Sequence, residues 1–516
     1  MAKKLDQLLA DLAGEQASVD QWVHPARVQV DTYAGRVQVD WDSEGASTAL
    51  GHAAFFVEYL KTAGLFDAWV ADCPLDYRSP NSPSRRDVLG TVLLSVLAGH
   101  WRYAHMTALR GDSVLAELLG LKCVVSEDAA RRGLGKVDEK GGEAWCRRHL
   151  DYACFAALGE PWILDVDTTI KPLFGHQEGA VKSFNPHKPG RPSHAYHTYM
   201  VANLRLVLDV DVQAGDRHTS NHTAPGLWAL LDRLGRDRWP AMLRGDAGFG
   251  NEPIMAEAER RELPYLFKLR QTANVRKAIV RAMGRSGWRN AGSGWEGKED
   301  SLRLTGWSRQ RRIIVLRRRL ERKLGLAERT NQGQLLLGFV EVGPDKELYE
   351  YAVLVTSLDS EIATIGQLYR DRADCENAFD ELKNHWGWGG FTTRDLKRCR
   401  LMARIIALAY NWWNIYVRLV NPDRHMEAIT SRPLLLHAIA RKTRHAGRIT
   451  LKLSTAHGAA SWAAAALTKA AAFLDGLKRT AQQLTPQQKW YRILSHALRK
   501  WLKGRQLHPP PRLAHA

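Results

Sequence analysis

The sequence has few cysteines, and their spacing matches neither a structural metal site nor a disulfide framework. Six cysteines occur in 516 residues, scattered along the chain with no CxxC pair. Zinc ribbons and disulfide-rich scaffolds need closely spaced cysteines, so neither class fits this chain. We therefore expect a protein of a reducing compartment, the cytoplasm.

Long hydrophobic runs are also missing. The most apolar stretch, residues 405–417, is too short to span a bilayer and is interrupted by Asn411 and Asn414. The first residues are polar and include Lys3 and Lys4, so we expect no signal peptide. With 45% hydrophobic residues, a chain of this length predicts a soluble protein of two to four domains.

Acidic residues are scarce towards the end of the chain, although the whole carries a net charge of +19. Residues 1–250 sum to −4, of which residues 1–150 contribute −3, whereas residues 251–516 sum to +23. Residues 401–516 alone reach +16. This asymmetry indicates a polyanionic partner such as DNA or RNA, held mainly by the second half. The charge alone leaves open the alternative that the protein simply has a basic composition and binds no polyanion.

Changes in hydrophobic periodicity predict an α/β fold made of five parts. Residues 1–150 read as an arm followed by short helices, one of which begins after Ser84. The short helices at 106–119 and 126–133 resemble a helix-turn-helix, which could bind the DNA ends. Residues 421–516 read as a basic helical region for DNA binding or dimerisation, with a capping box at Thr485. Between them we expect a core in two parts, 151–275 and 357–420, separated by an antiparallel β insertion at 276–356.

Within the core, three apolar runs read as strands. Residues 161–170 form a buried strand bounded by glycine and proline, and residues 197–202 and 204–212 follow as hairpin partners. Residues 241–246 form a later strand, which ends in the sequence GDAGFG and precedes a helix at 252–262.

Three carboxylates follow these elements in an order with chemical meaning. Asp167 ends the first strand, Asp246 ends the later strand, and Glu376 lies on the helix after the insertion. Carboxylates suit Mg²⁺, and two such ions can activate water or a 3′-hydroxyl for in-line attack on a phosphate. Asp165 shares a strand face with Asp167, but Asp167 lies nearer the carboxyl end. Taken singly, each aspartate could be a cap or turn residue.

Around Glu376 the sequence YRDRADCENAFDELK predicts a polar helix face. Tyr369, Arg372, Glu376 and Lys383 fall within about 60° of one another at helical spacing. Donors beside a metal-binding carboxylate would suit phosphate groups. A solvated face with ion pairs is the alternative.

Together these residues resemble the bacterial insertion-sequence DDE transposases that carry the YREK signature, a group to which the Tn-five transposase belongs. The motifs are Asp167 followed by two threonines, Asp246 within RGDAGFG, and the four polar residues of 369–383. The loop 175–194, which contains NPHKPGRP, resembles one subgroup in particular. The resemblance covers roughly residues 80–445.

This resemblance implies an RNase H-like catalytic core with an inserted β module, and two divalent ions, Mg²⁺ or substituting Mn²⁺. It also implies a homodimer acting on double-stranded DNA, namely the terminal inverted repeats and target DNA, in the nucleoid of a bacterium. Asp167 would bridge both ions, and Asp246 and Glu376 would each hold one. The residues implied to contact DNA are Tyr369, Arg372, Lys383, His187, Lys188 and Arg191.

Two other readings stay open. One is a metal-dependent nuclease on the same fold that cuts DNA without joining strands. The other is a non-catalytic DNA-binding protein descended from a transposase. Against the family pattern, residues 1–150 are slightly acidic, although this region commonly recognises the transposon ends.

Overall fold

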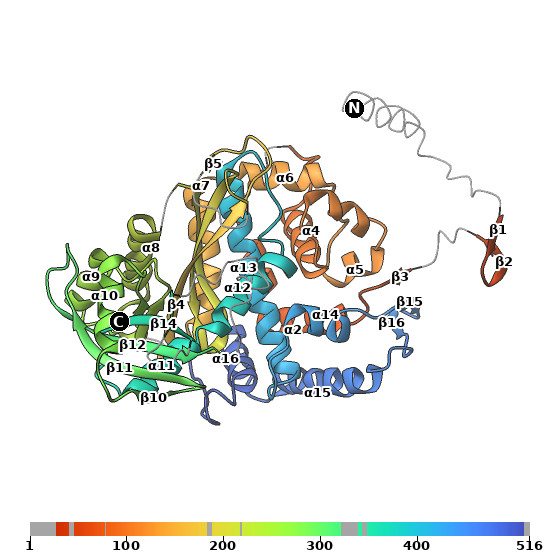
Figure 1. The fold of residues 1–516 in the computed structure, drawn as a ribbon. Coiled ribbons are helices and arrows are strands. Elements are labelled where there is room, and N and C mark those ends of the chain that lie inside the picture. The colour runs from red at the N-terminus through yellow and green to blue at the C-terminus, as the bar shows by residue number, and fades with distance from the viewer. Residues whose placement is uncertain are drawn as a thin grey trace, which may run out of the picture.

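An eleven-stranded sheet lies at the centre of the protein (Figure 1). The computed structural model describes residues 27–40, 46–77, 79–182, 188–216, 219–320, 339–342 and 348–509. Five strands of the sheet pair in the order β7-β6-β4-β8-β9. Their bounds are β4 (Ile163–Pro172), β6 (Pro192–Val201), β7 (Leu206–Ala214), β8 (Met242–Gly245) and β9 (Tyr265–Lys268).

These strands confirm the three that the apolar runs predict, including the hairpin, which is β6 and β7. β4, β6 and β7 are antiparallel, whereas β4 pairs with β8, and β8 with β9, in parallel. β7 and β8 run in the same direction with β6 and β4 between them, which requires a crossover connection, and α8 (Thr219–Leu234) supplies it. The carboxyl end of β8, at Gly245, pairs with Val166 in the middle of β4, which continues to Pro172.

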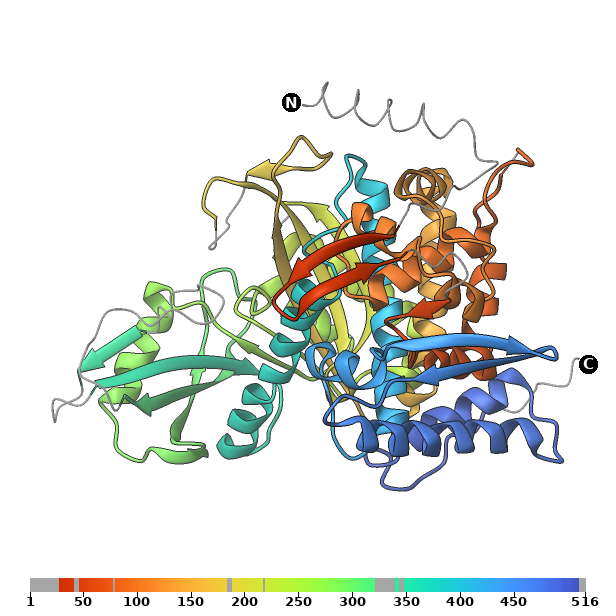
Figure 2. The same cartoon turned by 90° about the vertical axis from the view of Figure 1, so that its right-hand side faces the viewer.

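The strands of the predicted insertion are antiparallel, as their alternating pattern indicates, but they extend the same sheet. β14 pairs with β9, which joins the two groups of strands directly. Figure 2 shows this group extending to one side of the molecule, away from the terminal helices. The bounds are β10 (Arg289–Gly292), β11 (Trp295–Leu302), β12 (Arg311–Arg319), β13 (Phe339–Val342) and β14 (Leu348–Thr356), preceded by α10 (Ala273–Met283).

A long buried helix, α13 (Leu396–Val420), packs against β7 and against α7 (Glu139–Cys154). Asn411 and Asn414, which interrupt its apolar run, have structural partners. The Asn411 side chain accepts from the Val207 N–H and donates to the Val207 carbonyl, each at 2.8 Å. In the described part of the chain, no helix combines the length and apolar character needed to cross a bilayer.

The N-terminal helices begin where the sequence predicts in one case and not in another. Ser84 caps α4 (Arg85–Leu97) and accepts from the Asp87 N–H. The single helix expected at 106–119 is wrong: a 3₁₀ segment, Tyr103–Leu109, is followed by α5 (Ser113–Leu118). Asp112 caps α5 and so restarts the helix there. The other helices are α2 (Ala53–Ala63), α3 (Leu65–Ala71) and α6 (Glu127–Lys136).

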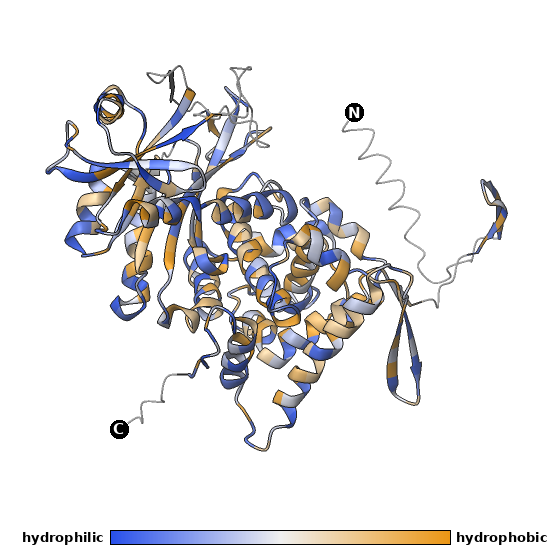
Figure 3. Ribbon diagram, turned by 60° about the horizontal axis from the view of Figure 1, so that its bottom comes forward, coloured by the Kyte–Doolittle hydropathy of each residue, from blue (hydrophilic) through white to orange (hydrophobic). Residues whose placement is uncertain are grey.

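The C-terminal region contains a hairpin that the helical prediction missed. β15 (Ala440–His445) and β16 (Arg448–Leu453) pair across Ala446 and Gly447, both with positive φ, and β15 also pairs with β3 (Ser47–Thr48). Figure 3 shows the hairpin projecting beyond the hydrophobic helices. The helices are α14 (Ala428–Leu435), α15 (Ala460–Arg479) and α16 (Pro486–Ala497), and the predicted capping box of α16 is present.

The exposed hairpin β1 (Val28–Thr32) and β2 (Gly35–Val39) lies outside this core, as its alternating sequence predicts.

Asp209 on β7 forms ion pairs with arginines of three different helices. Its buried carboxylate lies 2.6 Å from Arg147 of α7, 3.0 Å from Arg404 of α13 and 3.6 Å from Arg233 of α8. Burial raises the pKa of this carboxyl, but the three guanidinium groups outweigh burial and hold it below its usual range. Asp209, a weak candidate for chemistry from its DVD sequence, is therefore a structural residue.

Asp209→Ala should destabilise the protein, by about 3 kcal/mol, because it removes a counter-charge 3.0 Å from the buried Arg404, although Glu143 remains 3.1 Å from that guanidinium. Since the folded pKa is lowered, the stabilising effect of Asp209 is present above the unfolded pKa and is lost as pH falls below about 4. Urea unfolding of the variant and of Asp211→Ala, a more exposed neighbour on β7, measures both. Equal losses in the two variants would contradict this role.

Candidate active site

Two of the predicted metal ligands lie side by side on neighbouring strands. The prediction that Asp167 ends its strand is wrong, because β4 continues to Pro172, whereas Asp246 does follow the last residue of β8. Val166 pairs in parallel with Gly245, so Asp167 and Asp246 are the next residues on neighbouring strands, about 4.8 Å apart between strand axes. Asp246 sits in a turn, where its carboxylate accepts from the Gly248 N–H at 2.8 Å. The parallel register thus brings together two carboxylates that are far apart in sequence.

Asp165 is the other aspartate on the same strand face, and both of its carboxylate oxygens are engaged by an arginine. Its two oxygens accept from Arg244 Nε at 2.6 Å and Nη2 at 2.7 Å, and both side chains are buried. Arg244 also donates to the Leu368 carbonyl near the end of α11 (Ile362–Arg370). This ion pair connects β4, β8 and α11 close to the position of Asp167 and Asp246.

The segment expected to be one helix is two. α11 ends at Arg370, and α12 (Ala373–His385) begins after Arg372, whose N-cap position has φ −65°. At the break the Cys375 and Glu376 N–H groups both donate to the Arg372 carbonyl. The side chain of Arg372 is only 4% exposed, while its neighbours Asp371 and Ala373 face solvent. The single polar helix face that the spacing predicts is therefore interrupted at Arg372, and the alternative of a solvated face does not apply to this side chain.

Arg372 bridges the carboxylates of the site. Its Nη2 lies 3.3 Å from Asp167 Oδ1, and its Nη1 lies 2.5 Å from Glu376 Oε1. Burial lowers the pKa of the guanidinium, but the nearby anions, Asp167 first, outweigh burial and raise it. Glu376 remains exposed on α12, and Tyr369 is half-buried beside the group, where burial raises the pKa of its hydroxyl.

The electrostatics of Asp167 reflect this crowding of charge. Burial raises the pKa of its carboxyl to about 6; Arg372 opposes the rise, while Asp246 and Glu376 add to it. The negative charges of Asp246 and Glu376 thus act on Asp167. Among the described residues, however, the oxygen atoms of these three carboxylates do not all lie within 4.8 Å of one another. Oxygen ligands of this kind fit a divalent cation, which would relieve the repulsion that Arg372 partly offsets.

Beside the carboxylates lies a cavity of about 350 Å³ that places a second set of predicted residues. Lys383 of α12 and Lys188 line it, together with Thr169 and Ile170, which follow Asp167 on β4. Arg191 lies close by, with its guanidinium 5.1 Å from the Phe174 ring. His187, predicted in the same loop, lies outside the described residues.

Three cavity residues escaped the sequence analysis. Trp101 and Phe174 expose their rings, and Lys171 is buried beneath them, where burial lowers its pKa to about 8. Nothing in their local sequence marks them, since each is an isolated residue that only the fold brings to this cavity. Exposed rings with lysines suit nucleic acid, whose bases stack and whose phosphates attract cations.

A family model described as a transposase DDE domain of group 1 matches residues 36–473. The chain belongs to this family of DDE transposases. Its members generally use divalent metals, in keeping with the acidic groups of the site. No curated protein matches the chain. Among solved structures, a cryo-EM structure of the piggyBac transposase synaptic complex with hairpin DNA is similar over 88% of each chain, with 11% identity and a TM-score of 0.37.

In this DDE transposase, Asp165→Asn and Asp167→Asn should affect stability in opposite ways. Asp165→Asn leaves the buried charge of Arg244 unpaired and should cost about 3–5 kcal/mol. Asp167→Asn removes a carboxylate whose ionisation is disfavoured in the folded protein, so in the presence of EDTA it should retain or gain stability at neutral pH.

The pH dependence separates the two effects. Because the folded pKa of Asp167 is raised to about 6, the wild type loses up to roughly 3 kcal/mol relative to the asparagine variant as pH rises from 4 to 7. Thermal melting across that range measures the difference. A gap between the two melting temperatures that does not change with pH would contradict the assignment.

Proposed function

We propose that the chain cuts DNA at the ends of an insertion sequence and joins the freed 3′-hydroxyl to target DNA. The observation that carries this proposal is the closeness of Asp167 on β4 to Asp246 at the end of β8, together with Arg372, which contacts both Asp167 and Glu376. Membership of the DDE transposase family supports the same chemistry.

We assign the core an RNase H-like fold. Support comes from the strand order β7-β6-β4-β8-β9, with an antiparallel trio followed by two parallel strands. The core would comprise residues 151–275 and 357–420, with the β insertion at 276–356 between them. We also assign the chain to the YREK group and to the subgroup with the NPHKPGRP loop.

Two divalent ions, Mg²⁺ or Mn²⁺, would supply the activated nucleophile and stabilise the leaving oxygen. Asp167 would contact both, and Asp246 and Glu376 one each. The full engagement of Asp165 by Arg244 supports Asp167 as the ligand on β4. Arg372 would share its donors between these carboxylates and a DNA phosphate, because its planar group offers five N–H donors.

DNA would approach across the cavity beside the carboxylates. Lys383, Lys188 and Arg191 would contact phosphates there, with Tyr369 close to the metals; for His187 the same role rests on the sequence alone. The basic C-terminal region, residues 421–516, would bind further double-stranded DNA or support a homodimer that holds both inverted repeats.

Asp167→Asn, Asp246→Asn and Glu376→Gln should each abolish Mg²⁺-dependent cleavage, by at least about 10³-fold, while binding to the element's ends stays within a few-fold. Cleavage and strand transfer of an end-bearing DNA in one assay measure both reactions. Cleavage without joining would favour a nuclease, and function without metal a non-catalytic DNA-binding protein. Activity retained by Asp167→Asn but lost in Asp165→Asn would refute the ligand assignment.

Lys383→Ala should weaken DNA binding and reduce its salt dependence by about one unit of log–log slope, because one phosphate contact is lost. Its melting temperature should change little, since the side chain is only half-buried. Arg372→Ala should weaken DNA binding too, but with a loss of stability, since it leaves Asp167 half-buried beside like charges.

Lys61→Ala is the matched control for these variants, because Lys61 is an exposed lysine on α2, in the acidic half of the chain. It should leave both the affinity and the salt slope unchanged. Fluorescence anisotropy over a series of salt concentrations gives the slopes. A Lys383→Ala slope equal to that of wild type would remove Lys383 from the DNA interface.

A further inference from the structure

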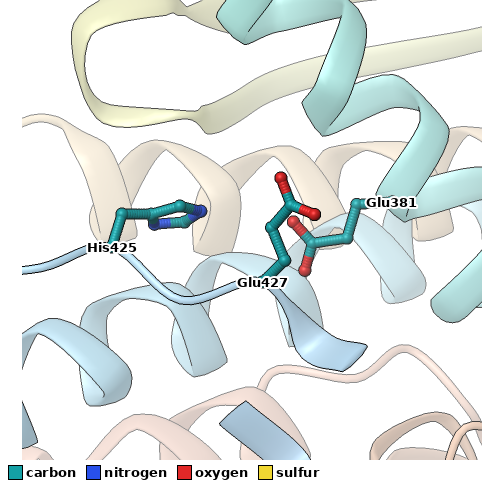
Figure 4. A group of neighbouring side chains, drawn as sticks. All are labelled: Glu381, His425 and Glu427. Atoms are coloured by element: carbon teal, nitrogen blue, oxygen red, sulfur yellow. The ribbon is translucent and has the colours of Figure 1, made fainter. Parts of the chain in front are cut away.

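Three ligand-bearing side chains meet on the side of α12 away from Glu376. One oxygen or nitrogen atom from each of Glu381, His425 and Glu427 lies within 4.8 Å of the others. Figure 4 shows Glu381 on α12, with His425 and Glu427 on the segment that leads from α13 into α14. Glu376 and Glu381 are five residues apart, about 140° around the helix, so the two groups occupy different faces of α12.

Glu381 is buried with half of its carboxylate unsatisfied. The side chain is 3% exposed, and its Oε1 accepts from Trp386 Nε1 at 3.1 Å and from the Ala428 N–H at 2.8 Å. Its Oε2 has no hydrogen-bond partner among the described residues. Burial raises the pKa of this carboxyl, because an ionised oxygen loses its hydration there. Such an oxygen is costly unless a cation or donor joins it.

His425 presents a neutral ring to the same place. Both ring nitrogens are buried and lack hydrogen-bond partners within the described ranges. Burial first, and then the charges of Arg418 and Arg205, lower its pKa to about 3. The imidazole is therefore unprotonated at neutral pH, which is the form that binds transition metals.

Arg205 contacts one member of the group, Glu427, whereas the other nearby arginines have partners outside it. Arg205 donates to Glu427 Oε1 at 3.0 Å and to Asp374 at 2.9 Å. Arg418 donates to the Leu204 carbonyl, and Arg432 to the carbonyls of Val96 and His385. The described contacts therefore leave Glu381 Oε2 and the ring nitrogens of His425 without hydrogen-bond partners, beside the carboxylate of Glu427.

We propose that Glu381, His425 and Glu427 form a second metal site, separate from the DDE carboxylates, which takes Zn²⁺ or a similar divalent transition ion. Two carboxylates balance the charge of the ion, and the imidazole favours such ions over Mg²⁺ and Ca²⁺, which prefer oxygen ligands. The bound ion ties α12 to the segment that precedes α14. It thereby braces the helix that carries Glu376.

The experiment measures bound metal and melting temperature on untagged, full-length protein after equilibration with Zn²⁺ or Mg²⁺ and removal of free ions. The variants are Glu381→Gln, His425→Ala and the triple change Asp167→Asn, Asp246→Asn, Glu376→Gln. Glu381→Gln keeps an oxygen for the Trp386 and Ala428 donors, so it tests the charge with little change in packing. His445→Ala, at an exposed histidine on β15, is the matched control.

The wild type, the triple variant and the control should each retain one Zn²⁺ per chain and melt a few degrees higher with it, because the ion binds only the folded state. Glu381→Gln and His425→Ala should lose that ion and that rise. Retention of the ion by both single variants, its loss from the triple variant, or no Zn²⁺ on the wild type would overturn the proposal. Loss of the ion from the triple variant would assign it to the DDE carboxylates.

Discussion

The buried ion pair between Asp165 and Arg244 holds together the three segments that carry the candidate active site. Asp165 belongs to β4, Arg244 to β8, and Arg244 also donates to the Leu368 carbonyl at the end of α11. Each element then carries or leads to one candidate ligand: Asp167 lies on β4, Asp246 directly follows β8, and α11 leads through Arg372 to Glu376. A buried pair tolerates little movement, since separating its charges leaves each without compensation. The rigidity that a metal site needs thus comes from residues that do not bind the metal.

Arg372 offsets the repulsion between the carboxylates that this arrangement brings together. Ionisation of Asp167 is disfavoured in this arrangement: burial first, and then repulsion from Asp246 and Glu376, raise the pKa of its carboxyl. A single guanidinium that contacts both Asp167 and Glu376 offsets that repulsion, and its planar fork can bridge two anions at once. The position of Arg372 at a helix break, not on a helix face, makes this contact possible. An arginine expected to face DNA is also part of the electrostatic support of the site.

Regular patterns in the sequence predict much of this fold. The buried strand at 161–170, the hairpin after it and the capping box at Thr485 follow from local periodicity and end signals. What failed depends on contacts between distant residues. The break at Arg372 carries no proline or glycine. The β15–β16 hairpin is an exception, because its second strand alternates polar and apolar residues and Gly447 lies in its turn, so a local signal was present. The continuity of the insertion strands with the core rests on the β9–β14 pairing, about 90 residues apart.

The same division holds at the site. Spacing on strands and helices selected Asp167, Asp246 and Glu376, because ligand residues at element ends leave a readable pattern. Alternation could not separate Asp165 from Asp167, since both lie on one face; only the partner Arg244, 79 residues away, distinguishes them. Trp101 and Phe174 reach the cavity through tertiary packing alone. Such residues leave no local signal, because only the fold brings them to the cavity.

One helix connects both acidic groups of the protein. α12 presents Glu376 to the DDE carboxylates and Glu381 to His425 and Glu427, and the short distance between them along the helix leaves little freedom for one to move without the other. Glu381 ties the helix to the start of α14 by accepting from the Ala428 N–H, while Arg372 ties its beginning to β4. Glu376 is the most exposed of the three DDE carboxylates, held by side-chain contact only with Arg372 among described residues. Its position therefore depends on how firmly both parts of α12 are held, which makes the side of this helix that carries Glu381 as important to the site as the side that carries Glu376.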